Sequence, residues 1–296
     1  FLKFLMKILA LRLLRLLLLL ILQQARAFNF CNNKQGYCEL AQSKHFMCRL
    51  STEMKPINKN IKLVVAIPDT YLLRERIIQY HNEFRNAMAS GVLKNKYKEY
   101  FPPAGSMREL IWDLELAYMA RTHVSTLSFR HSMCRAVKRF PIVGESMSMV
   151  IANTKHINLT KLLDLTLREM FYEYTTCPKP KSFVTKFNIA MFHDTIGHLA
   201  LMVNDRVSRV GCGFAVAKYC NKLQKTGYCY LMTCHYNYNI IAGTRIYKQG
   251  APASDCKRWE TSPSVNYLNL CANTGKIFRT KTEEDINYME SLRPKS

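Results

Sequence analysis

The chain has 296 residues, of which nearly half are hydrophobic, and a formal net charge of +22. This composition is that of a folded domain with a sizeable core, and no glycine-, serine- or proline-rich linker divides it. The basic excess favours glycosaminoglycans, anionic membrane surfaces or acidic proteins as partners; nucleic acid is disfavoured because no nucleic-acid-binding signature is present. The alternative is a solvated basic surface without a dedicated partner.

The first 27 residues predict a secretory signal peptide. They combine a basic start, a leucine-rich centre and the small-x-small sequence Ala25-Arg26-Ala27. Arg12 and Arg15 interrupt the apolar run, which is short of the roughly 20 apolar residues of a membrane span. An uncleaved N-terminal anchor is the alternative. Cleavage would leave a mature chain that begins at Phe28, carries a charge of +17 and has no stable membrane span. We therefore expect a secreted, extracellular protein with paired cysteines.

Three helices are predicted after a polar, loop-like segment at residues 31–48. Pro68-Asp69-Thr70 starts the first, which runs to about Gly91. Asp113 caps the second, and the third spans Asn158 to Tyr174. Apolar residues recur at helical spacing in the first helix and would face a core; they are Leu73, Ile77, Tyr80, Phe84 and Met88.

The pattern then changes to that of strands. Residues 207–217 and 228–236 have a β-type pattern and are rich in residues that favour strands, which predicts a hairpin with a long connecting loop. Helices followed by antiparallel strands indicate an α+β domain in which helices pack on the faces of a sheet.

Six short motifs occur in one order between residues 31 and 256 and resemble those of a known family. They are Tyr80-His-Asn-Glu-Phe-Arg85, the segment Met107 to Ala117 (MRELIWDLELA), His131-Ser-Met-Cys-Arg135, Val143-Gly-Glu145, Gly197-His198-Leu-Ala-Leu-Met-Val203, and Val210-Gly-Cys-Gly213 with Thr233-Cys-His-Tyr236. Together they resemble the CAP superfamily of cysteine-rich secretory proteins, antigen 5 and pathogenesis-related proteins, and most of all its insect antigen-5 branch. The two segments of the last motif resemble the family patterns V-G-C-G and x-C-N-Y.

The resemblance implies a three-layer α-β-α sandwich and a division of the chain. We expect a signal peptide at 1–27, a cysteine-rich loop segment at 28–66, a CAP domain at 67–250 and a C-terminal extension at 251–296. It also implies the disulfides Cys31–Cys48, Cys38–Cys134 and Cys212–Cys234. One further bridge of the insect branch is missing here, because its positions fall at Asn58 or a neighbour and at Leu127.

The remaining cysteines are assigned by proximity and elimination. Cys220–Cys229 and Cys256–Cys271 are local pairs, and the second would staple the C-terminal extension. Cys177 is left over, either as a buried free thiol, which we favour, or as an intermolecular link. Asn158-Leu-Thr160 is the only N-x-S/T sequon and predicts a glycan at the start of a surface helix.

Family resemblance places four residues in a central cleft: His131, Glu145, Glu173 and His198. Such a tetrad could bind a divalent metal such as zinc, although no cofactor is required by the sequence. The polar residues that follow the cleft histidine in the family are Leu199, Ala200 and Leu201 here, so side chains that would orient ligands are missing. Alternatively, both histidines are bound to carboxylates and hold no metal.

Three functions remain open. The leading one is a secreted, non-enzymatic protein that acts by extracellular binding, in venom, saliva or seminal fluid. The alternatives are a sterol or fatty-acid carrier and a metal-dependent hydrolase that uses the tetrad; no nucleophile with an adjacent base is evident. Lys94, Lys96 and Lys98, with Lys179 and Lys181, are the best local candidates for contact with an acidic glycan or lipid head group, or are solvated loops.

Overall fold

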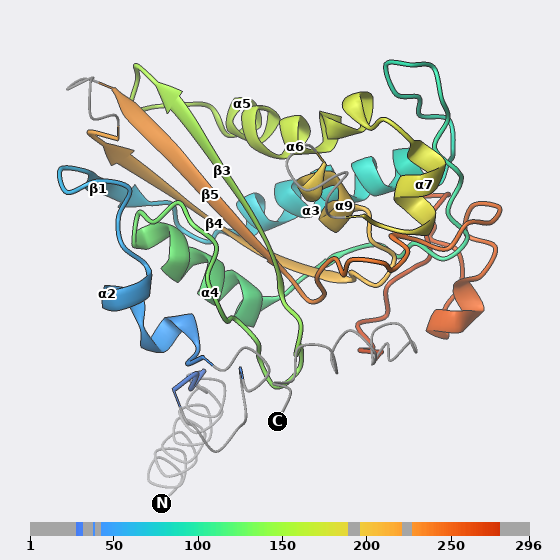
Figure 1. Ribbon diagram of the computed structural model, residues 1–296, viewed down its shortest axis with the longest axis horizontal. Helices are drawn as coiled ribbons and strands as arrows, with labels where there is room; N and C mark the ends of the chain where they lie inside the picture. The colour runs from blue at the N-terminus through green and yellow to red at the C-terminus, as the bar shows by residue number, and fades with distance from the viewer. Residues whose placement is uncertain (1–27, 32–37, 39–42, 189–195, 221–226, 279–296) are drawn as a thin grey trace, which may run out of the picture.

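The computed structural model describes residues 28–31, 38, 43–188, 196–220 and 227–278 (Figure 1). The predicted signal peptide lies outside these residues. Within them a sheet has the strand order β1-β4-β5-β3, and a short β2 pairs in parallel with β4. The strands are β1 (Lys62–Ala66), β2 (Ile111–Trp112), β3 (Gly144–Ala152), β4 (Arg209–Lys218) and β5 (Tyr228–Tyr236).

The predicted hairpin is present, because β4 and β5 pair as antiparallel neighbours in the middle of the sheet. Two further strands were not predicted. β1 lies in the segment that the sequence assigned to a loop, and it pairs with the outer edge of β4. β3 pairs with β5 along its whole length, with Glu145 opposite His235. The central sheet therefore gathers segments that are spread along the chain from Lys62 to Tyr236.

Helices cover both faces of this sheet (Figure 1). On β4, Phe214 and Val216 face the main core, which also contains residues of α3, α5, α6 and α9. The alternate residues Ala215 and Ala217 face a second core with Val124 of α4. Because successive side chains of a strand point to opposite faces, one strand supplies both cores. The three-layer α-β-α sandwich follows. The helices named here are α3 (Tyr71–Ala89), α4 (Leu114–Ser125), α5 (Leu159–Leu163), α6 (Glu169–Tyr172) and α9 (Gly197–Met202).

The glycines of the Val210-Gly-Cys-Gly213 motif allow α4 to approach the sheet closely. A Cβ on Gly211 would lie 2.1 Å from the backbone nitrogen of Ala117, and one on Gly213 would lie 2.6 Å from Cα of Arg121. Both contacts are with helix backbone, which has no room to move without breaking the packing. Any larger residue would push α4 away from β4.

The first two predicted helices are present with their predicted caps. Thr70 precedes α3, and its hydroxyl accepts a hydrogen bond from the backbone amide of Leu73. Asp113 precedes α4, and its carboxylate accepts hydrogen bonds from the backbone amides of Glu115 and Leu116. Each cap satisfies backbone donors that have no partner inside the helix.

The third predicted helix is not one regular α-helix. The chain stays helical from residue 159 to residue 176, but its winding changes. α5 passes into a π-helical turn, Asp164–Arg168, then α6, and then the 3-10 turn Glu173–Thr176. Within this stretch the Thr166 hydroxyl donates to the carbonyl of Leu162, which is a local bond of the kind that competes with regular helix geometry.

Short helices and disulfides attach the two ends of the described chain. Among the described residues, the remaining helical elements are the 3-10 turn Phe46–Cys48, α2 (Leu50–Glu53), α7 (Pro180–Thr185) and the 3-10 turn η5 (Cys256–Trp259). Leu270 of the C-terminal part is fully buried in the main core, so this segment is packed onto the sandwich. No helix among the described residues combines the length and the apolar character needed to cross a membrane.

Candidate functional site

The structure places the four predicted cleft residues in two histidine–glutamate pairs. Nδ1 of His131 lies 2.8 Å from Oε1 of Glu145, and Nδ1 of His198 lies 2.5 Å from Oε1 of Glu173. Since an ionised carboxylate only accepts, each imidazole donates. No hydrogen bond or ion pair between described residues joins one pair directly to the other.

Glu145 lies on β3 at the centre of a buried polar cluster. Its Oε2 accepts hydrogen bonds from His123 of α4 and from His235 of β5, both at 2.9 Å. The backbone amide of Ser132 donates to Oε1 and the hydroxyl of Ser132 to Oε2. Three histidines therefore surround one carboxylate, and the side chains of Glu145, His123 and His235 have no solvent exposure.

These donors determine the ionisation state of Glu145. Burial alone would raise the pKa of this carboxyl group, but the nearby charge of Arg135 and the hydrogen bonds from His123, His131 and His235 hold it well below its ordinary value. Burial lowers the pKa of His235 to about 4, and its bond to Glu145 does not offset this. Glu145 is thus a charged acceptor whose compensating charge is Arg135, with a Nη1–Oε1 distance of 3.6 Å.

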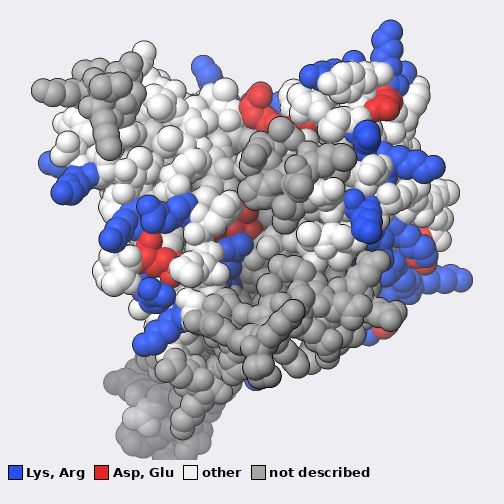
Figure 2. Space-filling model, viewed as in Figure 1, with Lys and Arg blue, Asp and Glu red and all other residues white. Residues whose placement is uncertain are grey.

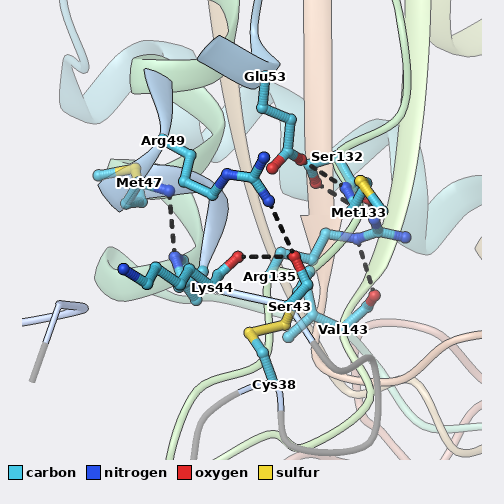
Figure 3. The surroundings of a disulfide bond; sticks show 12 residues. Cys38, Ser43, Lys44, Met47, Arg49, Glu53, Ser132, Met133, Arg135 and Val143 are labelled. Carbon is cyan, nitrogen blue, oxygen red and sulfur yellow. Dashed lines mark hydrogen bonds between the residues drawn. A yellow bond between two sulfur atoms is a disulfide. The ribbon is translucent and has the colours of Figure 1, made fainter. Parts of the chain in front are cut away.

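The segment that carries His131 is fixed by a disulfide and by hydrogen bonds (Figure 3). Cys134 is bridged to Cys38, and the backbone amide of Met133 donates to Glu53 at 2.7 Å. Arg135 donates to the carbonyl of Val143, next to the start of β3. The His131 side chain is nevertheless 62 % exposed, so it forms the solvent-facing side of the cluster.

The second pair joins two helical elements. Glu173 begins the 3-10 turn after α6, and His198 lies in the first turn of α9. The backbone amide of Leu199 donates to the second oxygen of Glu173. A backbone amide persists whatever side chain follows the histidine, so the apolar residues at 199–201 do not remove this support.

The bond to Glu173 also determines the pKa of His198. Burial lowers this pKa, but the hydrogen bond to Glu173 and the negative charge of Glu173 outweigh burial and raise the pKa above its ordinary value. The arrangement fits an imidazolium. A metal ion that bound His131 and His198 through Nδ1 would have to displace their bonds to Glu145 and Glu173.

We predict that the His198–Glu173 pair makes the stability of the protein depend on pH. The folded-state pKa of His198 is raised above 6.5, so its stabilisation is present below that value and is lost as the pH rises through the folded pKa. Burial lowers the pKa values of His45, His81 and His235 to about 4, so these three residues make stability rise with pH up to about 7 in both proteins and cancel in a comparison. Urea unfolding from pH 6.5 to about 8.5 should show that the stability of the wild type relative to His198→Gln decreases as the pH rises. Equal slopes would contradict the assignment.

The cysteines form the five pairs named from the sequence. They are Cys31–Cys48, Cys38–Cys134, Cys212–Cys234, Cys220–Cys229 and Cys256–Cys271. Cys177 is free and buried, and burial raises the pKa of its thiol to about 12, which makes it unreactive. At the positions of the missing bridge, the amide of Ile57 donates to the carbonyl of Leu127, and both side chains belong to one hydrophobic cluster.

The sequon residue Asn158 is the N-cap of α5, and its side-chain oxygen accepts a hydrogen bond from the amide of Thr160. Asn158 is exposed, so this cap is open to solvent.

Two residues of the cluster, His123 and His235, were missed as site residues. His123 stands at helical spacing on the apolar face of α4, where a histidine resembles a core residue. His235 carried a signal, since it replaces the Asn of the family motif, but its importance depends on the β3–β5 register that brings Glu145 opposite it.

The sandwich, the disulfides and the histidine–glutamate pairs define a CAP-type protein. The family model for the cysteine-rich secretory protein family, CAP, matches residues 78–236, which is more than half of the chain, and the chain belongs to this family. It is 30 % identical over 205 residues to Venom allergen 5 of Vespula pensylvanica, covering 68 % of this chain and 92 % of the relative. It is 27 % identical over 205 residues to Venom allergen-1 of Aedes aegypti, covering 69 % and 74 %.

The fold is also that of solved CAP-type structures. A crystal structure of NaASP2 with Zn2+ aligns with a TM-score of 0.55 and 21 % identity, covering 69 % of this chain and 98 % of that protein. The structure of BmVAL-1 aligns with a TM-score of 0.55 and 22 % identity, covering 69 % and 95 %. At these identities the likeness concerns the fold.

Proposed function

We propose that this protein is a secreted, non-enzymatic member of the antigen-5 branch that binds sulfated glycosaminoglycans. Secretion is supported by the leader sequence, by the five disulfides and by the likeness to venom allergens. The observation that carries the binding proposal is a hollow lined by basic residues on the outer surface, away from the histidine cluster.

This hollow is a cavity of about 460 Å³ at the start of α7. Lys179 and Lys181 line it together with the ring of Tyr100, the hydroxyl residues Ser182 and Thr185, and Glu99. Ammonium groups attract sulfate and carboxylate groups, hydroxyls donate to them, and an aromatic ring packs against a sugar face. Glu99 is the one acidic lining residue, and it is bonded to the side chain of Asn95.

Further basic side chains extend the hollow into a basic flank. Lys94 stacks over the ring of Tyr100 at 4.4 Å, and the amide of Lys96 bonds to the carbonyl of Thr175. We use "basic flank" for Lys94, Lys96, Lys98, Lys179 and Lys181. In Figure 2, Lys and Arg gather on the side of the molecule where α7 and η5 lie. A linear polyanion could contact several of these groups at once.

The non-enzymatic part of the proposal rests on the state of the tetrad. Glu145 is buried and already accepts five hydrogen bonds, so it has little capacity to act as a general base. Nδ1 of His198 is bonded to Glu173, which raises the pKa of His198. Robust protease or esterase activity that is lost in His198→Ala or Glu145→Gln would overturn this part.

Heparin affinity chromatography tests the binding part. We expect the wild type to bind and to elute at high salt, because multiple ammonium contacts release counterions. Lys179→Glu with Lys181→Glu should weaken binding by roughly tenfold or more, since two attractive contacts become repulsive. The measured quantities are the eluting salt concentration and the dissociation constant for a heparin oligosaccharide.

The matched control is Lys55→Glu with Lys59→Glu, which makes the same change in net charge at two exposed lysines away from α7. An equal loss of affinity in both double variants would show that only total charge matters and would contradict the proposed site. Tight binding to anionic phospholipid vesicles, with no binding to heparin, would point to a membrane surface and also contradict it.

A further inference from the structure

Behind the exposed His131 lies a fully buried set of three side chains of the kind that ligates metals. His123, Glu145 and His235 come from α4, β3 and β5, and one ligand atom of each lies within 4.8 Å of the other two. They occupy rigid elements, with Glu145 directly opposite His235 in the β3–β5 register. This set contains neither His198 nor Glu173.

We propose that His123, Glu145 and His235 form a buried site for a divalent transition-metal ion, with zinc the best match. Two imidazole nitrogens and one carboxylate oxygen form a common zinc donor set. The site is independent of the proposed glycan-binding hollow and of the His198–Glu173 pair.

The observed geometry is close to that of a metal-bound state. Nδ1 of His123 and Nε2 of His235 both lie 2.9 Å from Oε2 of Glu145. Zinc binds these atoms at about 2.0–2.2 Å, so tetrahedral ligand atoms are about 3.3–3.6 Å apart. A small outward shift of two side chains therefore makes room for the ion.

The proton balance is also satisfied. Each histidine now has its proton on the nitrogen that faces Glu145. When the metal takes that nitrogen, the proton moves to the other ring nitrogen and the imidazole stays neutral. Those nitrogens, Nε2 of His123 and Nδ1 of His235, are buried and have no hydrogen-bond partner among the described residues. No existing hydrogen bond is lost at them.

The two oxygens of Glu145 face different groups. Oε1 faces Arg135, His131 and the amide of Ser132, whereas Oε2 faces the two buried histidines. The metal would thus bind at the oxygen that does not contact the guanidinium group. The Ser132 hydroxyl, 3.1 Å from Oε2, is positioned to supply or orient a fourth ligand.

Phe46 closes the site on another side. Its ring centroid lies 5.9 Å from that of His123 and 6.0 Å from that of His235. An apolar ring against both ligands keeps out water, which strengthens the interaction of a cation with the carboxylate. The exposed His131 lies on the side through which an ion could enter.

Cobalt and zinc titrations of the full, oxidised protein test this site after dialysis against a chelator. We expect one Co2+ per chain with the intense visible absorption of tetrahedral coordination, displaced by Zn2+, and a higher melting temperature with Zn2+. His235→Asn, which restores the residue of the family motif, should weaken cobalt affinity at least tenfold. His198→Ala and Glu173→Gln should leave the affinity within about twofold.

The outcomes separate the two sites. Loss of cobalt binding in His198→Ala, with retention in His235→Asn, would assign the ion to the cleft and overturn the proposal. The absence of stoichiometric binding by the wild type would overturn it as well. Correct disulfides and a cooperative melt of metal-free His235→Asn exclude misfolding as the cause of lost binding. If that variant misfolds, His123→Gln takes its place, with the same expected loss.

Discussion

Replacing Arg85 with Met should lower the free energy of unfolding by about 4 kcal/mol or more. Arg85 is fully buried on α3, and its guanidinium donates to four backbone carbonyls. These belong to Arg108, Met202, Asn204 and Val207. Met has a similar length but no donor, so the variant leaves four buried carbonyls without this partner. Arg85 therefore links α3 to the segment that precedes β2 and to the turn that follows α9.

Urea denaturation of the purified variant measures this effect. The control is Arg76→Met, an exposed residue of the same helix, which should change stability by less than about 1 kcal/mol. If the Arg85 variant is secreted poorly, the ratio of secreted to retained protein gives the same ordering. If Arg85→Met lowers the free energy of unfolding no more than Arg76→Met does, the proposed role of Arg85 in linking these elements is contradicted.

Replacing Glu145 with Gln should destabilise the protein by about 3 kcal/mol. The carboxylate accepts from three histidines and from the backbone and hydroxyl of Ser132. A Gln side chain has one oxygen acceptor, and its amide group would face N–H donors in a buried cluster. Histidines can change tautomer, but the amide of Ser132 cannot. Arg135 would also lose its compensating charge.

Thermal and urea unfolding at neutral pH check this prediction, with Glu83→Gln as the control because Glu83 is exposed on α3. The Glu145 variant should also lose cobalt binding if the buried metal site exists. Wild-type stability in Glu145→Gln would show that the cluster tolerates a neutral amide and that the charge of Glu145 is unimportant.

Elements with strong local signals could be predicted from the sequence. α3 has a capping Thr70 and a regular apolar face, and β4 and β5 alternate clearly, so their local patterns agree with the fold. β3 has the sequence GESMSMVIA, which contains polar residues at buried positions. Its strand structure depends on pairing with β5 and on the polar partners of Glu145, neither of which is visible in a local window.

The candidate site was predictable only in part for the same reason. Family resemblance located His131, Glu145, Glu173 and His198, and the structure shows how each histidine bonds to one carboxylate. Sequence could not show that Glu145 also contacts His123 and His235, because those contacts join α4 and β5 through the sheet.

We propose that the protein acts by binding a sulfated glycan on its basic flank and not by chemistry at the histidine–glutamate pairs. Hydrogen–deuterium exchange of the purified protein, with and without a heparin oligosaccharide, tests this proposal. We expect slowed amide exchange at residues 94–100 and 179–185 and no change around His131 and His198. Protection confined to the segments that carry His131, Glu145, Glu173 and His198, or no protection at saturating oligosaccharide, would contradict it.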